Sequence, residues 1–170
     1  MKQFILVVRG PSGSGKSTLS KVIQEKIGEK VAVLKADYFY WKVCPQDKNK
    51  HIDENPIVYK NLLDLAENYL ESGYSVIVEG LLNKIDDFGL ESGLQKLSKQ
   101  YEANYKRIYL SVDLDTARIR HQNSDFSIPI EEVEGWAKGR EMKVNDKDEI
   151  TDTVKNSQED LVNLVLEKII

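Results

Sequence analysis

Short apolar runs recur along the chain, and in each run several aliphatic residues follow one another. Such runs are typical of strands that a sheet buries on both faces. We expect strands at residues 2–9, 31–36, 74–79 and 107–112, and a short fifth strand at 150–151. The pattern therefore predicts a sheet whose strands come from the whole length of the chain.

Between these runs, apolar residues recur every three or four positions, the period of a helix with one buried face. The first such helix covers 16–27, and Gly28 ends it. Further helices are expected over 56–73 and 86–104, from about residue 113, and from Ser157 to the end of the chain. Residues 37–55 and 121–148 have at most a weak period, so we expect irregular structure there.

Strands that alternate with helices favour a parallel sheet covered by helices on both faces. Because right-handed crossovers join such strands, their carboxyl ends meet at one edge, where ligands bind in this kind of fold. No internal repeat, low-complexity tract or Pro/Gly/Ser-rich linker divides the chain. We therefore predict one α/β domain over residues 1–170.

Composition narrows the range of partners. The 170 residues include 24 Lys and Arg against 28 Asp and Glu, a formal net charge of −4, so we expect no stable contact with nucleic acid. Because no apolar run reaches the roughly 18 residues that a membrane span needs, we expect no membrane contact. Cys44 is the only cysteine, which excludes an internal disulfide and favours the reducing cytoplasm.

The strongest motif is Gly10-Pro11-Ser12-Gly13-Ser14-Gly15-Lys16-Ser17, which fits the phosphate-loop pattern G-x-x-x-x-G-K-[ST] between a strand and a helix. The glycines let backbone N–H groups surround a phosphate, and the helix N-terminus favours its charge. We expect Lys16 to reach the β- and γ-phosphates of ATP as a catalytic residue, and the Ser17 hydroxyl to bind Mg²⁺. The predicted nucleotide-binding residues are Gly10, Ser12, Gly13, Ser14, Gly15, Lys16, Ser17 and Thr18.

Three classes of phosphate-loop protein compete for this chain: a GTPase switch, a mechanical ATPase and a kinase. Asn83-Lys84-Ile85-Asp86 fits the NKxD pattern that reads guanine in GTPases, but it follows the third strand too early and no DxxG precedes it. A mechanical ATPase normally needs more chain and an acidic pair after a strand, where this chain has the single acid Glu79. The length favours a small kinase.

A kinase needs a carboxylate near the acceptor hydroxyl and cations near the migrating charge. Asp37 ends the second strand at the ligand-binding edge, and we expect it to bind the acceptor and act as the base, with a helix-capping or Mg²⁺-water role as the alternative. Glu79 ends the third strand and is expected to contact the Mg²⁺ site from its second coordination sphere or to contact the acceptor, with a structural hydrogen bond as the alternative. The aromatic run 38–41 fits stacking on the acceptor and packing under the sheet edge equally well.

Three stretches together resemble the phosphate-loop small-molecule kinases: the loop itself, Asp37-Tyr38-Phe39-Tyr40, and Val76-Ile77-Val78-Glu79-Gly80. The aromatic stretch is similar to that of uridine and nicotinamide riboside kinases. The size and layout are closer to the chloramphenicol phosphotransferase, zeta-toxin and polynucleotide kinase group. The stretch from Thr116 to His121, with Phe126 and Trp136 downstream, resembles a bacterial P-loop kinase family. The resemblance implies a three-layer P-loop NTPase fold with a five-stranded parallel sheet of order 2-3-1-4-5, ATP with Mg²⁺, and a lid.

The same resemblance places the lid at about residues 118–143. It implies that Arg120 lies over the ATP phosphates as a catalytic residue, that Arg118 helps to bind ATP, and that Arg140 joins the catalytic site when the lid closes. Polynucleotide kinases and zeta toxins carry an arginine soon after the aspartate, whereas the first basic residue after Asp37 is Lys42. This departure counts against a polynucleotide or nucleotide-sugar acceptor.

We therefore expect a phosphotransferase that moves the γ-phosphate of Mg·ATP to a hydroxyl group of a small-molecule acceptor. The alternative outside the kinases is a nucleotide-binding sensor, or an ATPase or GTPase without such an acceptor. A toxin-like kinase of a cell-wall precursor is an alternative within the enzyme class. The sequence leaves the acceptor and the oligomeric state open.

Overall fold

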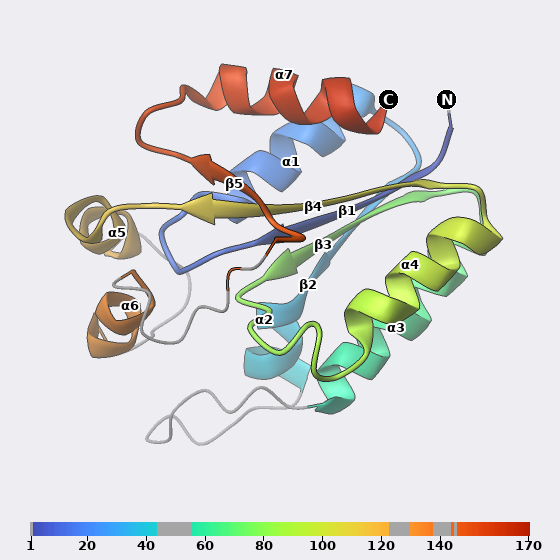
Figure 1. The fold of residues 1–170 in the computed structure, drawn as a ribbon, viewed down its shortest axis with the longest axis horizontal. Helices are drawn as coiled ribbons and strands as arrows, with labels where there is room; N and C mark the ends of the chain where they lie inside the picture. The colour runs from blue at the N-terminus through green and yellow to red at the C-terminus, as the bar shows by residue number, and fades with distance from the viewer. Residues whose placement is uncertain (1, 44–55, 123–129, 138–143, 145) are drawn as a thin grey trace.

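The computed structural model describes residues 2–43, 56–122, 130–137, 144 and 146–170. Its centre is a five-stranded parallel sheet with the order β2-β3-β1-β4-β5 (Figure 1). The strands are β1 (Phe4–Arg9), β2 (Val31–Lys35), β3 (Ser75–Gly80), β4 (Asn104–Ser111) and β5 (Glu149–Asp152). The predicted α/β class, parallel pairing and strand order are confirmed.

Helices cover the sheet on both faces, with α1 and α7 on one side and α3 and α4 on the other (Figure 1). The helices are α1 (Lys16–Ile27), α2 (Ala36–Tyr38), the π-helical turn η1 (Phe39–Val43), α3 (Pro56–Glu71), α4 (Leu90–Gln100), α5 (Leu114–His121), α6 (Ile130–Ala137) and α7 (Gln158–Ile169). Within the ranges that the structure describes, no helix is both long enough and apolar enough to cross a membrane.

The expectation of irregular structure was wrong for parts of two segments. Residues 36–43 form α2 and η1, because Ala36 and Tyr40 pack into the core and favour a helical turn there. Residues 130–137 form α6, in which Val133 is buried against Ala117 of α5. Both helices are too short to show a clear period in the sequence.

The helix expected over 86–104 is shorter than predicted. It begins at Leu90, after Gly89 at a φ of +77°, and ends before Glu102, whose φ of +52° is also left-handed. The next strand starts at Asn104, three residues before the expected 107, and its first residues are half-buried. Their mixed polarity hides the start of this strand in the sequence.

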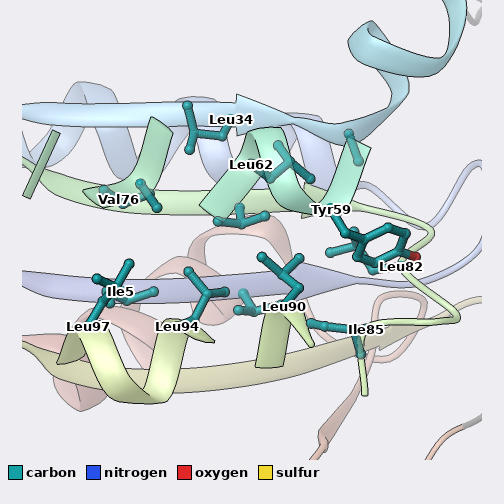
Figure 2. Close-up of a cluster of buried hydrophobic side chains, with 14 of the residues drawn as sticks. Ile5, Leu34, Tyr59, Leu62, Val76, Leu82, Ile85, Leu90, Leu94 and Leu97 are labelled. Carbon is teal, nitrogen blue, oxygen red and sulfur yellow. The ribbon is translucent and has the colours of Figure 1, made fainter. Parts of the chain in front are cut away.

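The side chains of β1 divide the core into two clusters. Ile5 faces α3 and α4 (Figure 2), and Val7 belongs to the same cluster, whereas Phe4, Leu6 and Val8 face α1 and α7. All of them are fully buried. Because burial of one such side chain stabilises the fold by about 1.5–3 kcal/mol, β1 is a firm support for the loop that follows it.

The carboxyl ends of β2, β3 and β1 meet at one edge of the sheet. In the register of the strands, Lys35 of β2 lies beside Glu79 of β3, and Arg9 of β1 lies beside Gly80. Asp37 follows β2 by two residues, and the phosphate loop follows β1 directly. The fold therefore brings the predicted site residues of three separate segments to the same edge.

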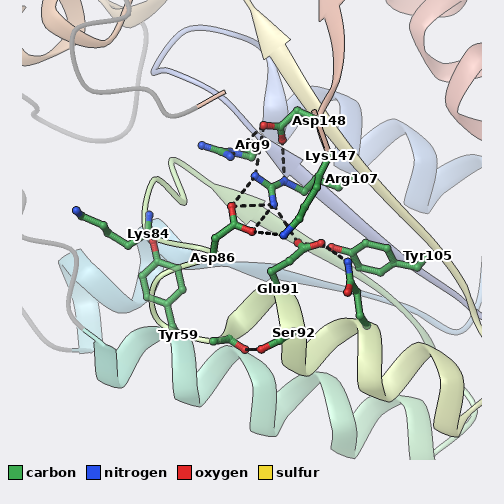
Figure 3. Close-up of polar contacts among 12 residues, drawn as sticks. Arg9, Tyr59, Lys84, Asp86, Glu91, Ser92, Tyr105, Arg107, Lys147 and Asp148 are labelled. Atoms are coloured by element: carbon green, nitrogen blue, oxygen red, sulfur yellow. Dashed lines mark hydrogen bonds and ion pairs between the residues drawn. The ribbon is translucent and has the colours of Figure 1, made fainter. Parts of the chain in front are cut away.

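A network of buried charges ties β1 and β4 to the neighbouring loops (Figure 3). Arg107 of β4 lies 2.7 Å from Asp148, which precedes β5. It also lies 3.2 Å from Asp86, between β3 and α4, and 3.2 Å from Glu91, in the first turn of α4. Arg9 lies 3.2 Å from the second carboxylate oxygen of Asp148. Figure 3 shows the carboxylates gathered around Arg107, so this network fixes the loops beside the sheet edge.

Candidate active site

The phosphate loop lies between β1 and α1, and its shape depends on glycine at position 13. Gly13 has a φ of +77°, in the left-handed region that favours glycine. A Cβ atom there would lie 2.8 Å from the carbonyl oxygen of Ala117, so α5 packs directly on the loop. No side chain in the described part of the chain caps the N-terminus of α1. The backbone N–H groups of this helix end can therefore receive an anion.

Lys16, the first residue of α1, is buried inside the loop. Its Nζ donates hydrogen bonds to the carbonyl oxygens of Gly10 at 2.9 Å and Pro11 at 2.8 Å. Burial lowers the pKa of Lys16, and the negative charges of Asp37 and Glu79 oppose this shift. The loop's own carbonyl groups therefore hold the ammonium group that the motif assigns to the phosphates.

Glu79 is buried at the end of β3 and lies beside Ser17. The Ser17 hydroxyl donates to Glu79 Oε1 at 2.8 Å, and the Lys35 ammonium lies 3.5 Å from the same oxygen. Glu79 Oε2 is buried and has no hydrogen-bond partner among the described residues. A hydroxyl beside a carboxylate with an open oxygen fits Mg²⁺, which binds few protein oxygens and completes its shell with phosphates and water.

These two residues are not a metal site by themselves. No group of three or more His, Cys, Asp and Glu side chains is placed to hold a metal ion within residues 2–43, 56–122, 130–137, 144 and 146–170. A metal ion at Ser17 and Glu79 would therefore need ligands from a bound nucleotide, as is usual for Mg²⁺ in phosphoryl transfer.

Asp37 lies in the first turn of α2 and is half-buried. Burial raises the pKa of Asp37. The positive charges of Lys16 and Lys35 oppose this rise, and the negative charge of Glu79 adds to it. The charges of these four residues act on one another, so the structure brings the predicted catalytic lysine and the two predicted carboxylates into one small region. A carboxylate with a raised pKa accepts a proton more readily.

A hollow of about 650 Å³ opens next to this region, between α1 and the edge strand β2. Ser17 and Lys21 line it from α1, and Val33 and Lys35 line it from β2. Ser17 and Lys35 also contact Glu79. The hollow therefore adjoins the residues that fit Mg²⁺.

The structure separates the members of the aromatic run after Asp37. Tyr40 is buried in the core cluster that α3 and α4 cover, and Phe39 packs against this cluster. Tyr38 is 54% exposed and meets the Phe39 ring edge-on at 6.2 Å. The side chain of Trp41 lies outside the described residues. Of the three described aromatic residues, only Tyr38 has enough free surface for a ligand.

Two arginines of α5 point to different neighbours. Arg120 Nη1 donates to the carbonyl oxygen of Gly13 at 3.2 Å and to the Thr153 hydroxyl at 3.2 Å, so it lies against the phosphate loop. Arg118 Nη2 lies 2.6 Å from Glu134 of α6, and this pair joins α5 to α6. The structure therefore brings Arg120, but not Arg118, to the loop. Arg140 and half of the expected lid segment lie outside the described residues.

The structure gives the Asn83-Lys84-Ile85-Asp86 stretch a structural setting. Asp86 accepts hydrogen bonds from Arg107 at 3.2 Å and from Lys147 at 3.0 Å, and the Lys84 backbone N–H donates to the Tyr59 hydroxyl at 3.3 Å. A guanine-reading aspartate needs a free carboxylate, whereas this one is shared by two cations. The contacts fit the interpretation of this stretch as a polar loop.

The network around Arg107 and the approach of His121 to the loop were not predicted from the sequence. His121 Nδ1 lies 3.4 Å from the Ser12 hydroxyl, although no motif assigns this histidine a place. Arg9 ends the otherwise apolar strand β1, and Arg107 is buried in β4 directly before the run from Ile108 to Leu110. A charge inside a buried strand needs a partner, so these positions were the available signal.

The strand order, the loop and the charges beside it define a P-loop nucleotide-binding domain of the kinase-like class. The sequence profile of a family described as an AAA domain matches residues 5–164, and the chain belongs to this family. A search of curated protein sequences finds no match.

Solved structures with a similar fold include kinases of small molecules. A sugar kinase from Janibacter sp. HTCC2649 has a TM-score of 0.72 at 17% identity, over 98% of this chain and 94% of that one. The Mycobacterium tuberculosis APS kinase in complex with AMPPNP and APS has a TM-score of 0.65 at 14% identity, over 98% and 96%. A gluconokinase from Sinorhizobium meliloti 1021 has a TM-score of 0.62 at 16% identity, over 98% and 91%. At these identities the likeness establishes the fold.

Proposed function

We propose that the protein transfers the γ-phosphate of Mg·ATP to a hydroxyl group of a small-molecule acceptor. The observation that carries this proposal is the grouping of Lys16, Ser17, Asp37 and Glu79 at one edge of the sheet. Lys16 and Ser17 are needed by any phosphate-loop protein, but a carboxylate with a raised pKa beside them is what a kinase needs in addition.

In the proposed reaction, the γ-phosphorus forms a bond to the acceptor oxygen while its bond to the oxygen that leaves with ADP breaks. The acceptor hydroxyl proton passes to Asp37, and the raised pKa of this carboxyl supports that role. Lys16 exchanges the carbonyl oxygens of Gly10 and Pro11 for oxygens of the β- and γ-phosphates. Its positive charge then stabilises the charge that develops on the transferred group.

Ser17 and Glu79 would hold Mg²⁺, which when bound neutralises charge on the β- and γ-phosphates. The buried Glu79 Oε2, which lacks a partner in the described part of the chain, supports this assignment. Arg120 is proposed to neutralise further charge at the transferred phosphate, because it already contacts the loop at Gly13. The ATP-binding role of Arg118 and the catalytic role of Arg140 stay predictions from the family resemblance.

A small molecule is the acceptor class that the comparisons support best. The similar structures are named as kinases of sugars, gluconate and APS. We further propose, from the sequence resemblance, that the protein is related to the chloramphenicol phosphotransferase, zeta-toxin and polynucleotide kinase group. Tyr38, the exposed aromatic residue next to Asp37, is proposed to contact the acceptor.

The proposal is tested by incubating the protein with γ-labelled ATP, Mg²⁺ and pooled acceptors: nucleosides, sugars, sugar acids, aminoglycosides, chloramphenicol and oligonucleotides. We expect label on one small compound, with ADP formed in equal amount. Label released only as inorganic phosphate would instead favour an ATPase. Tight ATP binding without turnover would favour a nucleotide sensor. Either result would overturn the kinase assignment, provided that the pool contains an alcohol of each class.

A further inference from the structure

Two buried arginines, Arg9 at the end of β1 and Arg107 in the middle of β4, differ in how many of their guanidinium N–H groups have hydrogen-bond partners. Arg107 donates from Nε at 2.7 Å and Nη2 at 3.3 Å to the two oxygens of Asp148. Its Nη1 donates to Asp86 and Glu91, at 3.2 Å each. Within the described residues, Arg9 has one hydrogen bond, from Nη1 to Asp148 Oδ2 at 3.2 Å. Arg107 is therefore satisfied on every side, and Arg9 on one.

The two guanidinium nitrogens of Arg9 that lack partners in the described part of the chain lie next to each other on one side of the group. Nε and Nη2 are buried without a hydrogen-bond partner among the described residues, and Arg9 as a whole is 0% exposed. These two nitrogens carry parallel N–H groups, the fork that holds a carboxylate or a phosphate through two hydrogen bonds. Arg107 uses the same fork on Asp148, which shows what such a group binds in this protein.

An unfilled fork of this kind needs an explanation. A buried donor without a partner costs about 1–3 kcal/mol or more, and groups of this kind are rare in folded proteins. Asp148 cannot neutralise Arg9 fully, because its two oxygens also accept from Arg107. The face of Tyr109, whose ring centre lies 5.9 Å from Arg9 Cζ, adds only a weak attraction for the cation.

The position of Arg9 relates the fork to the proposed transfer site. Arg9 is the last residue of β1 and precedes Gly10 of the phosphate loop. Neighbouring parallel strands lie about 4.8 Å apart, so β1 and β2, with β3 between them, are about 10 Å apart. This separation between the backbones that carry Arg9 and Asp37 matches the length of a small sugar acid or sugar phosphate.

The fork also lies on the side of the sheet opposite to the nucleotide-binding helix. Along β1, Arg9 shares a face with Ile5 and Val7, which pack toward α3 and α4, whereas α1 covers the other face. Figure 3 shows Arg9 with Arg107 above the α3/α4 side. The phosphates of ATP are assigned to the N-terminus of α1, so the anion that fills this fork belongs to the second substrate.

We propose that the acceptor is an anionic alcohol whose carboxylate or phosphate group binds the Nε and Nη2 atoms of Arg9. The inference rests on the proposed kinase function and makes it more specific. The segment after Asp37 has aromatic residues in place of the arginine that holds the acceptor anion in polynucleotide kinases and zeta toxins. In this proposal Arg9 supplies that positive charge.

The first test compares pairs of related acceptors in which one member carries an anionic group and the other is neutral. The pairs are gluconate with glucose, glycerate with glycerol, and glucose 6-phosphate with glucose, each assayed for ADP formation with Mg·ATP. We expect the anionic member of at least one pair to have a KM at least about tenfold lower, the effect of a hydrogen-bonded charge pair. The pair that shows this difference in KM indicates whether the acceptor anion is a carboxylate or a phosphate. Equal use of neutral and anionic members would overturn the proposal.

The second test measures anion binding without nucleotide, so that it does not depend on transfer. Calorimetric titration of the preferred anion into the wild-type protein should give a dissociation constant that Arg9→Gln weakens at least about tenfold. Lys106→Gln is the matched control, because it removes the same charge from the strand β4 on the opposite face of the sheet. Equal binding by Arg9→Gln and Lys106→Gln would refute the role of Arg9.

Arg9→Lys keeps the result interpretable if Arg9→Gln fails to fold. Lysine retains the charge beside Asp148 but cannot form the fork. We expect the lysine variant to fold, to bind Mg·ATP as the wild type does, and to lose the preference for the anionic acceptor. If the variant keeps the preference, Arg9 does not bind the acceptor. The wild type could also bind the anion at Arg9 without phosphorylating any alcohol. That result would support an anion site at Arg9 but would refute both the kinase assignment and the claim that the anion belongs to an acceptor.

Discussion

Two clusters of buried charge lie near the same sheet edge, and they differ in how completely their charges are paired. In the network, Arg107 donates from all three guanidinium nitrogens to Asp148, Asp86 and Glu91. In the phosphate-loop cluster, Lys16 rests on two backbone carbonyl groups, and Glu79 keeps a buried oxygen without a partner among the described residues.

This difference separates a structural cluster from a chemical one. A fully paired ion network loses much stability when one member is removed, because the remaining charges stay buried. A binding site must instead exchange its partners for those of a ligand, so its groups are held by contacts that can be given up. Arg9 belongs to the network through Asp148 but is incompletely paired, which is why we place it with the chemical group.

The largest effect expected from this comparison is on stability. Arg107→Met should lower the free energy of unfolding by about 3–5 kcal/mol, because it leaves buried carboxylates without their shared cation. Urea unfolding followed by circular dichroism measures this value. Lys106→Met, one position away on β4, is the control for the loss of charge and should change it little. Equal stability of the two variants would show that the network is dispensable.

The next effect is on catalysis. Lys16→Ala should lower kcat by about 10³-fold, because the charge on the transferred phosphate loses its nearest cation. The melting temperature should stay close to that of the wild type, since burial already disfavours the Lys16 charge in the folded protein. Steady-state assays of ADP formation together with thermal melts check both parts. An active Lys16→Ala variant would refute the assignment of the site.

Local patterns were sufficient to predict the sheet and the loop. The apolar run at 4–8, the glycines after it and the helical period after Lys16 are consecutive in the sequence, and each supports the others. The same reasoning placed Asp37 and Glu79 at one edge, because parallel strands order their carboxyl ends. The single-domain extent and the cytoplasmic location stay predictions.

Long-range pairing explains what the sequence did not reveal. Arg107 meets Asp148 across 41 positions and Arg9 meets it across 139, and no periodic pattern marks such pairs. The short helical segments α2, η1 and α6 form because Ala36, Tyr40 and Val133 find apolar partners elsewhere in the fold. Tertiary contacts of this kind override weak local preferences.

Asp37→Asn tests the comparison between the paired network and the phosphate-loop cluster, because it should lower the rate of phosphoryl transfer and raise the stability of the fold. Without a base, phosphoryl transfer should slow by about 10²-fold, while the dissociation constant for ATP stays unchanged. Because the pKa of Asp37 is raised in the folded protein, its charge opposes folding at neutral pH, and the asparagine variant should melt at a higher temperature. Loss of ATP affinity along with the rate would indicate a role in metal binding or structure.

The same shift predicts a pH dependence. A raised pKa means that the stabilising contribution of protonated Asp37 is full below its unfolded pKa of 3.8 and is lost as the pH rises through the folded pKa. The deprotonated base needed for transfer has the opposite profile, so kcat should fall as the pH is lowered through the folded pKa. The stability difference between wild type and Asp37→Asn should shrink over the same interval, and a constant difference would contradict the shift.

The smallest effect is expected at the contact between α5 and α6, where the sequence predicted an ATP-binding Arg118 and the structure pairs this residue with Glu134. If the ion pair positions α6, Arg118→Ala and Glu134→Gln should both raise the KM for ATP, by about fivefold or less, because exposed ion pairs contribute little. If Arg118 instead binds the phosphates, Glu134→Gln frees it and lowers the KM while Arg118→Ala raises it. We expect both variants to raise the KM for ATP. A lower KM in Glu134→Gln would show that Arg118 belongs to the phosphate-binding charges and not to a structural ion pair.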